Sequence, residues 1–261
     1  MRKYRNEAIV VIDSNPRSAV KYKDDYAIVC VDVIRSTTTA VTAVAMGRRC
    51  FPAGNLEHAL ELSITLAGQH PLLAGELGGR TPRGFELNNS PVAVSMHNDL
   101  KRPLILLSSS GTPLIGEASG GLATFLACLR NMTAAAEFFA GRYRKVAVIG
   151  AGSRNEFREE DQYCCARIAE ILTRNGFRPG TRKTKDVLEK WRDAPVDSFM
   201  FSKSVEFLKQ TQQEHDLNFT LSHVDDLNSC FMMADGEVLM IPDAARSRPK
   251  EMRTYAHVAR N

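Results

Sequence analysis

Residues 26–47 constrain the fold of this chain more than any other stretch. They open with an apolar run, Ala27–Val31, whose length and β-branched content are typical of a fully buried strand. A polar turn follows, and apolar residues then recur at helical spacing until Gly47, a residue type that often ends a helix. The segment therefore predicts a strand, a turn and a helix, the unit from which layered α/β folds are built.

The turn of this unit is crowded with polar side chains. Asp32 follows the strand directly, and Arg35, Ser36 and Thr37 come soon after it. Ligands of open α/β sheets bind at the carboxyl ends of strands, and a helix capped by Ser36 or Thr37 would present free N–H groups to an anion. The turn thus predicts an anion site beside an acid able to bind a metal. The alternative is an ordinary capped helix with a surface arginine.

The rest of the chain continues the α/β pattern. Further predicted strands lie at residues 8–12, 49–53, 71–74, 103–107, 122–129, 145–149 and 236–242. Predicted helices lie at 56–68, 131–139, 159–175, 184–193 and 202–213, and residues 14–25 are predicted as a loop. We expect one domain over residues 1–261, a layered α/β/α fold with a mixed sheet, ending in a polar basic tail at 243–261. A faint similarity of VCVDV to VAVIGAG leaves two similar halves, about 1–120 and 121–242, as an alternative.

A long Gly-rich loop follows the strand at 71–74. It carries Glu76 and Asn89 and ends at Ser90, where Ser followed by Pro91 predicts the start of a helix. Loops of this length inside a compact domain are usually functional or mobile. A solvated connection with its charges in water is the alternative.

Two more predicted strands run into polar turns. Ser110, Gly111 and Thr112 follow the strand at 103–107, where small residues let the backbone approach a ligand and Thr112 is a predicted helix cap. The turn lacks the lysine of a P-loop. Glu160 and Asp161 open the helix after the strand at 145–149. They are either a second carboxylate group facing the first turn or simple compensation of the helix dipole.

Composition excludes several classes of protein. The net charge of +4 is small and the basic residues are dispersed, so we expect no nucleic-acid partner but a small anionic substrate. The six cysteines form no CxxC pair, which favours reduced thiols and a cytoplasmic location. No signal-peptide pattern and no apolar stretch of membrane-spanning length is present, so we expect no membrane association.

Several motifs together resemble the 2-phosphosulfolactate phosphatase family of coenzyme M biosynthesis. They are VDVIRSTTT at 31–39, GELGG and GFELNNSP within 75–91, SSSGT at 108–112 and NEFREED at 155–161. The resemblance spans most of the chain, and the four motifs occur in the family's order. It implies an α/β fold, a Mg²⁺ requirement and hydrolysis of a phosphomonoester of a small acidic molecule.

The resemblance also implies a set of site residues. Asp32, Arg35 and Glu160 are the predicted catalytic residues, with Glu160 as general base for a water molecule and a covalent intermediate on Asp32 as the rival mechanism. The predicted Mg²⁺ ligands are Asp32, Glu76 and Asp161. The predicted substrate-binding residues are Ser36, Thr37, Asn89, Ser90, Ser110, Gly111 and Thr112. A homodimer is a further expectation.

The chain departs from the family pattern inside these motifs. Leu77 stands where the family usually carries arginine, Asn88 where it carries glycine, and Ser110 where it carries asparagine. Arginine could pair bidentately with a second anion of the substrate, and leucine is unable to do so. We therefore expect weak activity on phosphosulfolactate itself. Another hydrolase or lyase acting on a phosphate-bearing or nucleoside-like substrate, and a non-catalytic anion-binding homologue, are the alternative functions.

Overall fold

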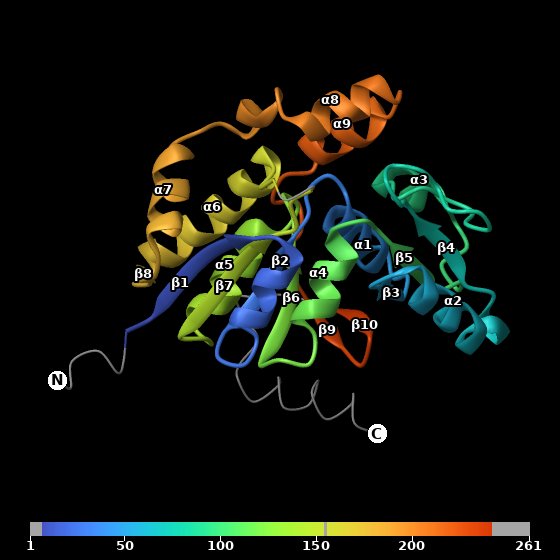
Figure 1. The fold of residues 1–261 in the computed structure, drawn as a ribbon, viewed down its shortest axis with the longest axis horizontal. Helices are drawn as coiled ribbons and strands as arrows, with labels where there is room; N and C mark the ends of the chain where they lie inside the picture. Colours follow the sequence, from blue (N-terminus) through green and yellow to red (C-terminus); the bar gives the residue numbers. More distant parts are fainter. Residues whose placement is uncertain (1–6, 154–155, 242–261) are drawn as a thin grey trace.

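A seven-stranded mixed sheet forms the centre of the protein (Figure 1). The computed structural model describes residues 7–153 and 156–241, so the predicted tail at 243–261 lies outside the described residues. The strand order is β10-β9-β6-β2-β7-β1-β8, and β9 and β10 are antiparallel to their neighbours while the others are parallel. The strands are β1 (Ile9–Ser14), β2 (Ala27–Val31), β6 (Ala123–Ala127), β7 (Lys145–Gly150), β8 (Arg178–Pro179), β9 (Cys230–Ala234) and β10 (Glu237–Ile241).

A smaller parallel sheet is built from the chain between β2 and β6. Its order is β3 (Cys50–Ala53), β5 (Leu104–Leu107) and β4 (Leu72–Gly75). The predicted α/β class with a mixed sheet is therefore confirmed, and the second sheet is a feature that the sequence analysis did not predict. Short apolar runs predict strands without indicating which sheet they join, because sheet membership depends on contacts between distant segments.

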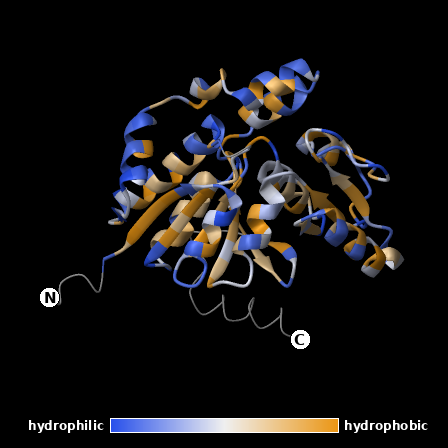
Figure 2. Ribbon diagram, viewed as in Figure 1, coloured by the Kyte–Doolittle hydropathy of each residue, from blue (hydrophilic) through white to orange (hydrophobic). Residues whose placement is uncertain are grey.

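Alternating side chains of the central strands face two different helix layers. Val10 and Ile12 pack toward α5 (Met132–Ala140), α6 (Glu159–Arg174) and α7 (Arg182–Lys190). Val11 packs on the other face toward α1 (Ser36–Ala45), α4 (Gly111–Ala118) and the 3-10 helix η1 (Pro16–Lys21). The small sheet packs against α1 and α4, and α2 (Leu56–Thr65) covers its outer face. The strands are the most hydrophobic ribbons, and the outer helix α7 is largely hydrophilic (Figure 2).

Several local predictions need correction. The predicted loop at 14–25 contains η1, and the sequence analysis missed both β9 and α9 (Glu214–Ser222). Neither Ser36 nor Thr37 caps α1, because Arg35 is the N-cap residue, and Ser110 rather than Thr112 precedes α4. The hydroxyls of Thr37 and Thr112 instead bond to the backbone that follows β2 and β5. The prediction that Ser90 caps α3 (Pro91–Met96) is confirmed, since its hydroxyl accepts from the N–H of Ala93.

The remaining helices are α8 (Lys203–Gln210) and the short 3-10 helices η2 (Ala67–Gln69) and η3 (Val196–Phe199). Within the described part of the chain, no helix has the length and apolar character needed to cross a bilayer. The strands β2 and β7, whose sequences echo each other, are neighbours in the large sheet. The two-halves alternative, the homodimer and the cytoplasmic location stay predictions.

Candidate functional site

Four strand-end turns and one helix meet around a single cavity of about 480 Å³. The turns follow β2 and β7 of the large sheet and β4 and β5 of the small sheet. Residues of α8 also line the cavity, and Figure 1 shows α8 beyond the carboxyl ends of the central strands. The lining residues are Asp32, Ile34, Arg35, Glu76, Gly78, Gly79, Asn89, Ser109, Ser110, Gly152, Ser153, Arg158, Glu160, Asp161, Lys203, Ser204, Phe207 and Leu208.

The turn after β2 is fastened by threonine side chains. The hydroxyl of Thr37 accepts from the Asp32 N–H at 2.9 Å and lies 2.8 Å from the carbonyl oxygens of both Asp32 and Ala127. The Thr38 hydroxyl donates to the Val33 carbonyl at 2.7 Å. These bonds hold the backbone around Asp32 in place, so that its carboxyl group lies in the cavity lining.

The turn after β5 packs tightly against this first turn. The Ser108 and Thr112 side chains each accept from the other residue's N–H at 2.9 Å, which closes the turn. A β-carbon added at Gly111 would lie 2.5 Å from the Ser36 β-carbon and would also collide with the Asp32 carboxyl. Only glycine therefore fits at this position, and its lack of a side chain lets the two sheets bring their strand ends together.

The turn after β7 brings two more carboxyl groups to the cavity. Asp161 accepts from the Val33 N–H at 2.8 Å and from the Gly152 N–H at 3.3 Å, so it joins this turn to the first. Glu160 is 1% exposed, and its Oε2 is buried without a hydrogen-bond partner among the described residues.

Crowding of acids in a buried site raises their pKa values. Burial, together with the charges of Glu76 and Glu160, raises the pKa of Asp32 to about 7. Burial also raises the pKa of Asp161 well above its usual range, helped by the charges of Asp32 and Glu160, and burial raises the pKa of Glu160. Shifts of this kind are typical of catalytic groups, and a cation among these acids would reverse them.

Glu76 holds the loop after β4 to the turn after β5. Its carboxylate accepts from the Ser109 N–H at 2.7 Å, from the Ser109 hydroxyl at 2.9 Å and from the Gly79 N–H at 2.7 Å. The side chain is half-buried and lines the cavity. Because its carboxylate accepts from three donors, Glu76 has a structural function, in addition to its predicted function as a Mg²⁺ ligand.

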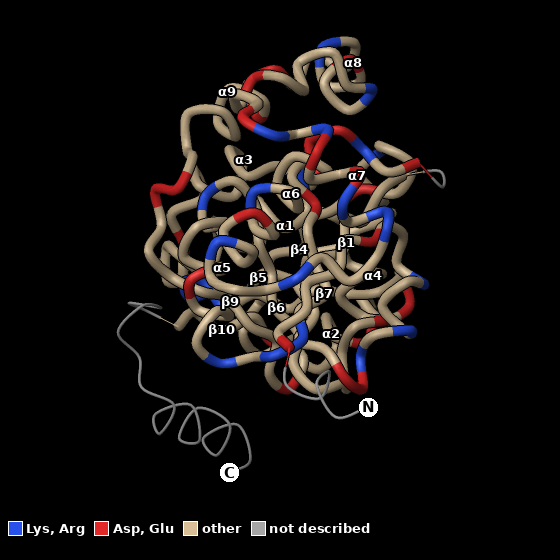
Figure 3. Tube along the Cα trace, turned by 90° about the vertical axis from the view of Figure 1, so that its left-hand side faces the viewer, with Lys and Arg blue, Asp and Glu red and all other residues tan. Residues whose placement is uncertain are grey.

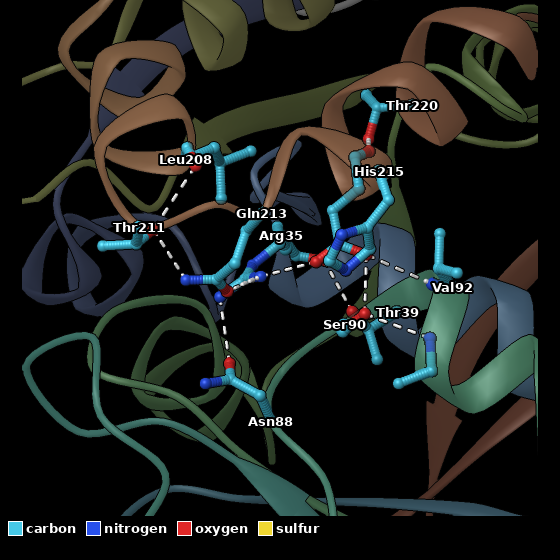
Figure 4. Close-up of polar contacts among 12 residues, drawn as sticks. Arg35, Thr39, Asn88, Ser90, Val92, Leu208, Thr211, Gln213, His215 and Thr220 are labelled. Carbon is cyan, nitrogen blue, oxygen red and sulfur yellow. Dashed lines mark hydrogen bonds and ion pairs between the residues drawn. The ribbon is translucent and has the colours of Figure 1, made fainter.

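Cationic side chains on the cavity wall complement the acids. Arg158 and Lys203 both pair with Glu156, at 2.8 and 2.6 Å. Arg35 is 5% exposed and forms an ion pair of 2.5 Å with Asp216 of α9 (the ion pair and its neighbours are drawn in Figure 4). Lys and Arg positions occur along α8 at the top of Figure 3. The cavity therefore offers both signs of charge within one small volume, as binding of a phosphate and a cation requires.

The structure brings together part of the predicted site. Seven predicted residues line the cavity: Asp32, Arg35, Glu76, Asn89, Ser110, Glu160 and Asp161. Five do not line it: Ser36, Thr37, Ser90, Gly111 and Thr112. Ser36, Thr37, Ser90 and Thr112 are buried, and their hydroxyls bond to backbone or to other buried side chains. Their predicted part in substrate binding stays a prediction.

The sequence analysis missed the residues that α8 and α9 contribute. Ser204, Phe207 and Lys203 of α8 line the cavity, and Asp216 of α9 pairs with Arg35. The sequence of α8 is that of an ordinary amphipathic helix, whereas α9 shows little helical periodicity and was not predicted as a helix, so neither segment indicated a function. Arg158 lay within a recognised motif and could have been found there, whereas Asn155 of that motif lies outside the described residues.

The acids of the cavity are oxygen donors of the kind that Mg²⁺ prefers. Among residues 7–153 and 156–241, no three Asp, Glu, His or Cys side chains gather as a complete metal site. Mg²⁺ usually takes only one or two carboxylates and completes its shell with water and substrate oxygens. The buried carboxyls of Asp32 and Asp161 and the unpartnered Oε2 of Glu160 are oxygen donors of this kind, and they fit such a partial site.

Comparison with known proteins gives a consistent result. A family model described as 2-phosphosulpholactate phosphatase matches residues 11–232.

The chain is similar to three curated proteins, each named probable 2-phosphosulfolactate phosphatase. It is 32% identical over 146 residues to that of Synechococcus sp. (strain JA-2-3B'a(2-13)), covering 55% of this chain and 60% of the relative. It is 33% identical over 155 residues to that of Carboxydothermus hydrogenoformans, covering 59% and 63%. It is 26% identical over 209 residues to that of Caldicellulosiruptor saccharolyticus, covering 76% and 85%. In the first two, the match spans less than two thirds of the relative's own length.

Proposed function

Because the chain belongs to the 2-phosphosulfolactate phosphatase family, we propose that it is a Mg²⁺-dependent phosphatase acting on a phosphomonoester of a small acidic molecule. The single observation that carries this proposal is the meeting of Asp32, Glu160 and Asp161 with Arg35 in one cavity at the strand ends. Phosphoryl transfer needs little covalent chemistry from the protein and depends on positioning and on neutralisation of charge. A cavity with both buried acids and a buried guanidinium suits those needs.

The residues of the chain have distinct parts in the proposed reaction. A cation held by Asp32 and Asp161 would supply charge neutralisation and lower the pKa of a bound water. Arg35 donates to phosphoryl oxygens in the transition state. Glu160, whose pKa is raised by burial, accepts the proton of the attacking water. In the rival route, Asp32 itself attacks phosphorus, the P–O bond to the substrate breaks and its alkoxide leaves as the alcohol after taking a proton. Water then hydrolyses the acyl phosphate to restore Asp32 and release phosphate. Trapping a phosphorylated Asp32 by mass spectrometry would distinguish the two routes.

Removal of divalent metal is expected to abolish turnover. Without a cation, the burial and mutual repulsion of the acids favour their protonated forms. The measurement is phosphate release from a panel of small phosphomonoesters after dialysis against EDTA, followed by addition of Mg²⁺ or Mn²⁺. Full turnover in EDTA would contradict the metal requirement. Absence of turnover on the whole panel with Mg²⁺ present would instead favour the binding-protein or lyase alternatives.

The structure changes which residues are candidates to bind a second charged group of the substrate. Leu77 is 40% exposed and does not line the cavity, so its side chain tells less about the substrate than its place in the motif suggested. Arg158 and Lys203 do line the cavity, and both form an ion pair with Glu156. We therefore propose that these two cations face the second charged group of the substrate.

We still expect phosphosulfolactate to be a poorer substrate than a phosphorylated hydroxy acid without a second strong anion, such as phospholactate. Leu77 offers no positive charge, and Arg158 and Lys203 already pair with Glu156, so a sulfonate would have to compete with that carboxylate for them. The measurement is kcat/KM for phosphosulfolactate, phospholactate, sugar phosphates and nucleotides at equal Mg²⁺. A clear preference for phosphosulfolactate would overturn this expectation and show that the change at Leu77 left the specificity intact.

A further inference from the structure

The guanidinium of Arg35 is held from three sides by residues far away in the sequence. Its Nη1 donates to Asp216 Oδ2 and to Gln213 Oε1, both at 2.5 Å, and its Nη2 donates to Asn88 Oδ1 at 3.0 Å (Figure 4). Asp216 is fully buried, so the pair lies where water screens it little. A buried guanidinium without such a partner would be strongly unfavourable.

Asp216 is itself fixed by the first turn of α3. Its Oδ1 accepts from the Ser90 hydroxyl at 2.6 Å and from the Val92 N–H at 3.3 Å. The Ser90 hydroxyl in turn caps α3. The Asp216 carboxylate therefore joins α9, α3 and the turn after β2. Its Oδ1 bonds to the start of α3, and its Oδ2 accepts from Arg35. This arrangement explains the burial of Ser90 away from the cavity.

The bonds of Arg35 leave a defined set of donors unused. Both Nη1 hydrogens and one Nη2 hydrogen are taken, so Nε–H and the second Nη2–H have no bond to any residue that the structure describes. Nε and Nη2 lie on the same edge of the planar group, the edge that pairs bidentately with phosphate oxygens. Arg35 lines the cavity. The bonds that hold Arg35 therefore leave Nε–H and one Nη2–H of this cavity-lining guanidinium without an acceptor among the described residues.

We propose that Asp216 is a positioning residue that acts through Arg35, presenting the Nε–Nη2 edge of that side chain to the phosphoryl group. The inference rests on the proposed function, because it takes the phosphoryl group to be the ligand of this edge. Asp216 touches no substrate itself, since it does not line the cavity.

The test uses Asp216→Asn in the full-length protein, with Asp226→Asn as the matched control. Asp226 also pairs with a buried arginine, Arg130, at 2.6 Å, but neither residue lines the cavity. We expect kcat/KM for phosphate release to fall about 30-fold in Asp216→Asn and to stay within about twofold of wild type in Asp226→Asn. If Asp216→Asn does not fold, Gln213→Ala removes one Nη1 acceptor without removing charge, and an about threefold loss is expected from it.

A double-mutant cycle separates positioning from general structural support. If Asp216 acts through Arg35, then adding Asp216→Asn to Arg35→Ala should cost no further activity, whereas a merely structural residue would add its own loss. The same cycle is run on the binding of inorganic phosphate, measured by titration calorimetry with Mg²⁺. Losses that multiply in the double variant, wild-type values in Asp216→Asn, or a wild type that binds no phosphate would each overturn the proposal. A protein that binds phosphate with the expected coupling but hydrolyses no panel member would keep this inference and refute only the phosphatase activity.

Discussion

Asp32→Asn is expected to lower kcat/KM by about a thousandfold, which corresponds to about 4 kcal/mol of transition-state stabilisation. Asp32 lines the cavity where the β2 turn meets the turns after β5 and β7. Metal binding and nucleophilic attack both need an ionised carboxylate, and asparagine provides neither. The measurement is steady-state phosphate release with saturating Mg²⁺, with wild-type protein purified in parallel. Retention of more than about a tenth of the wild-type rate would place Asp32 outside the chemistry.

The same variant is expected to be more stable than wild type above neutral pH. The pKa of Asp32 is raised to about 7, above its ordinary value of 3.8, so the folded state binds more protons than the unfolded state between these values. Stability from this group is therefore fully present at low pH, falls as pH rises from about 4 to 7, and stays low above that. Asparagine mimics the protonated form and avoids this loss.

The gain is expected to be on the order of 4 kcal/mol in the free energy of unfolding at pH 8 and smaller at pH 5. It is measured by urea denaturation in EDTA, because a bound cation would stabilise the charged wild-type carboxylate instead. A variant that is less stable than wild type at pH 8 would show that the carboxylate stabilises the fold. An active, more stable variant would contradict the proposed function of Asp32 but not its burial.

Gly111→Ala is expected to lower activity by about a hundredfold while the protein remains folded. A β-carbon at this position would lie 2.5 Å from the Ser36 β-carbon and against the Asp32 carboxyl, so the turns after β2 and β5 must move apart. Displacement of a catalytic group by a fraction of an ångström is enough for such a loss. The measurements are kcat/KM and the midpoint of thermal unfolding.

Gly116→Ala provides the matched control for this substitution. Gly116 lies in the same helix, α4, and a β-carbon there would have only the Gly54 α-carbon near it, at 4.0 Å. Alanine favours a helix interior over glycine by about 1 kcal/mol, so Gly116→Ala should be fully active and at least as stable as wild type. Equal losses in both variants would indicate that α4 tolerates no side chain at either glycine and that the contact with Asp32 is not the cause.

Local sequence determined the framework of this protein. The strand, turn and helix at 26–47 formed as predicted because apolar periodicity and turn residues act over a few neighbouring residues. The same reasoning placed Asp32, Glu160 and Asp161 at strand ends, and parallel strands bring those ends to one edge of the sheet. The family motifs are local signals too, and they sufficed to predict the family and most of the acidic residues in the cavity.

Tertiary structure alone decided which polar side chains face the cavity. The hydroxyls of Thr37 and Thr112 bond to backbone groups that only the folded turns bring near them. The residue types therefore predicted polar turns, but they did not predict whether each side chain faces the cavity. Arg35 meets Asp216 of α9 across 181 residues of chain. The helices α8 and α9 complete the site, yet α8 has the sequence of an ordinary amphipathic helix and α9 shows little helical periodicity. Such contacts depend on how the layers of the fold pack together. A hydrogen bond between distant segments produces no periodic pattern in the sequence of either segment, so the sequence does not predict it.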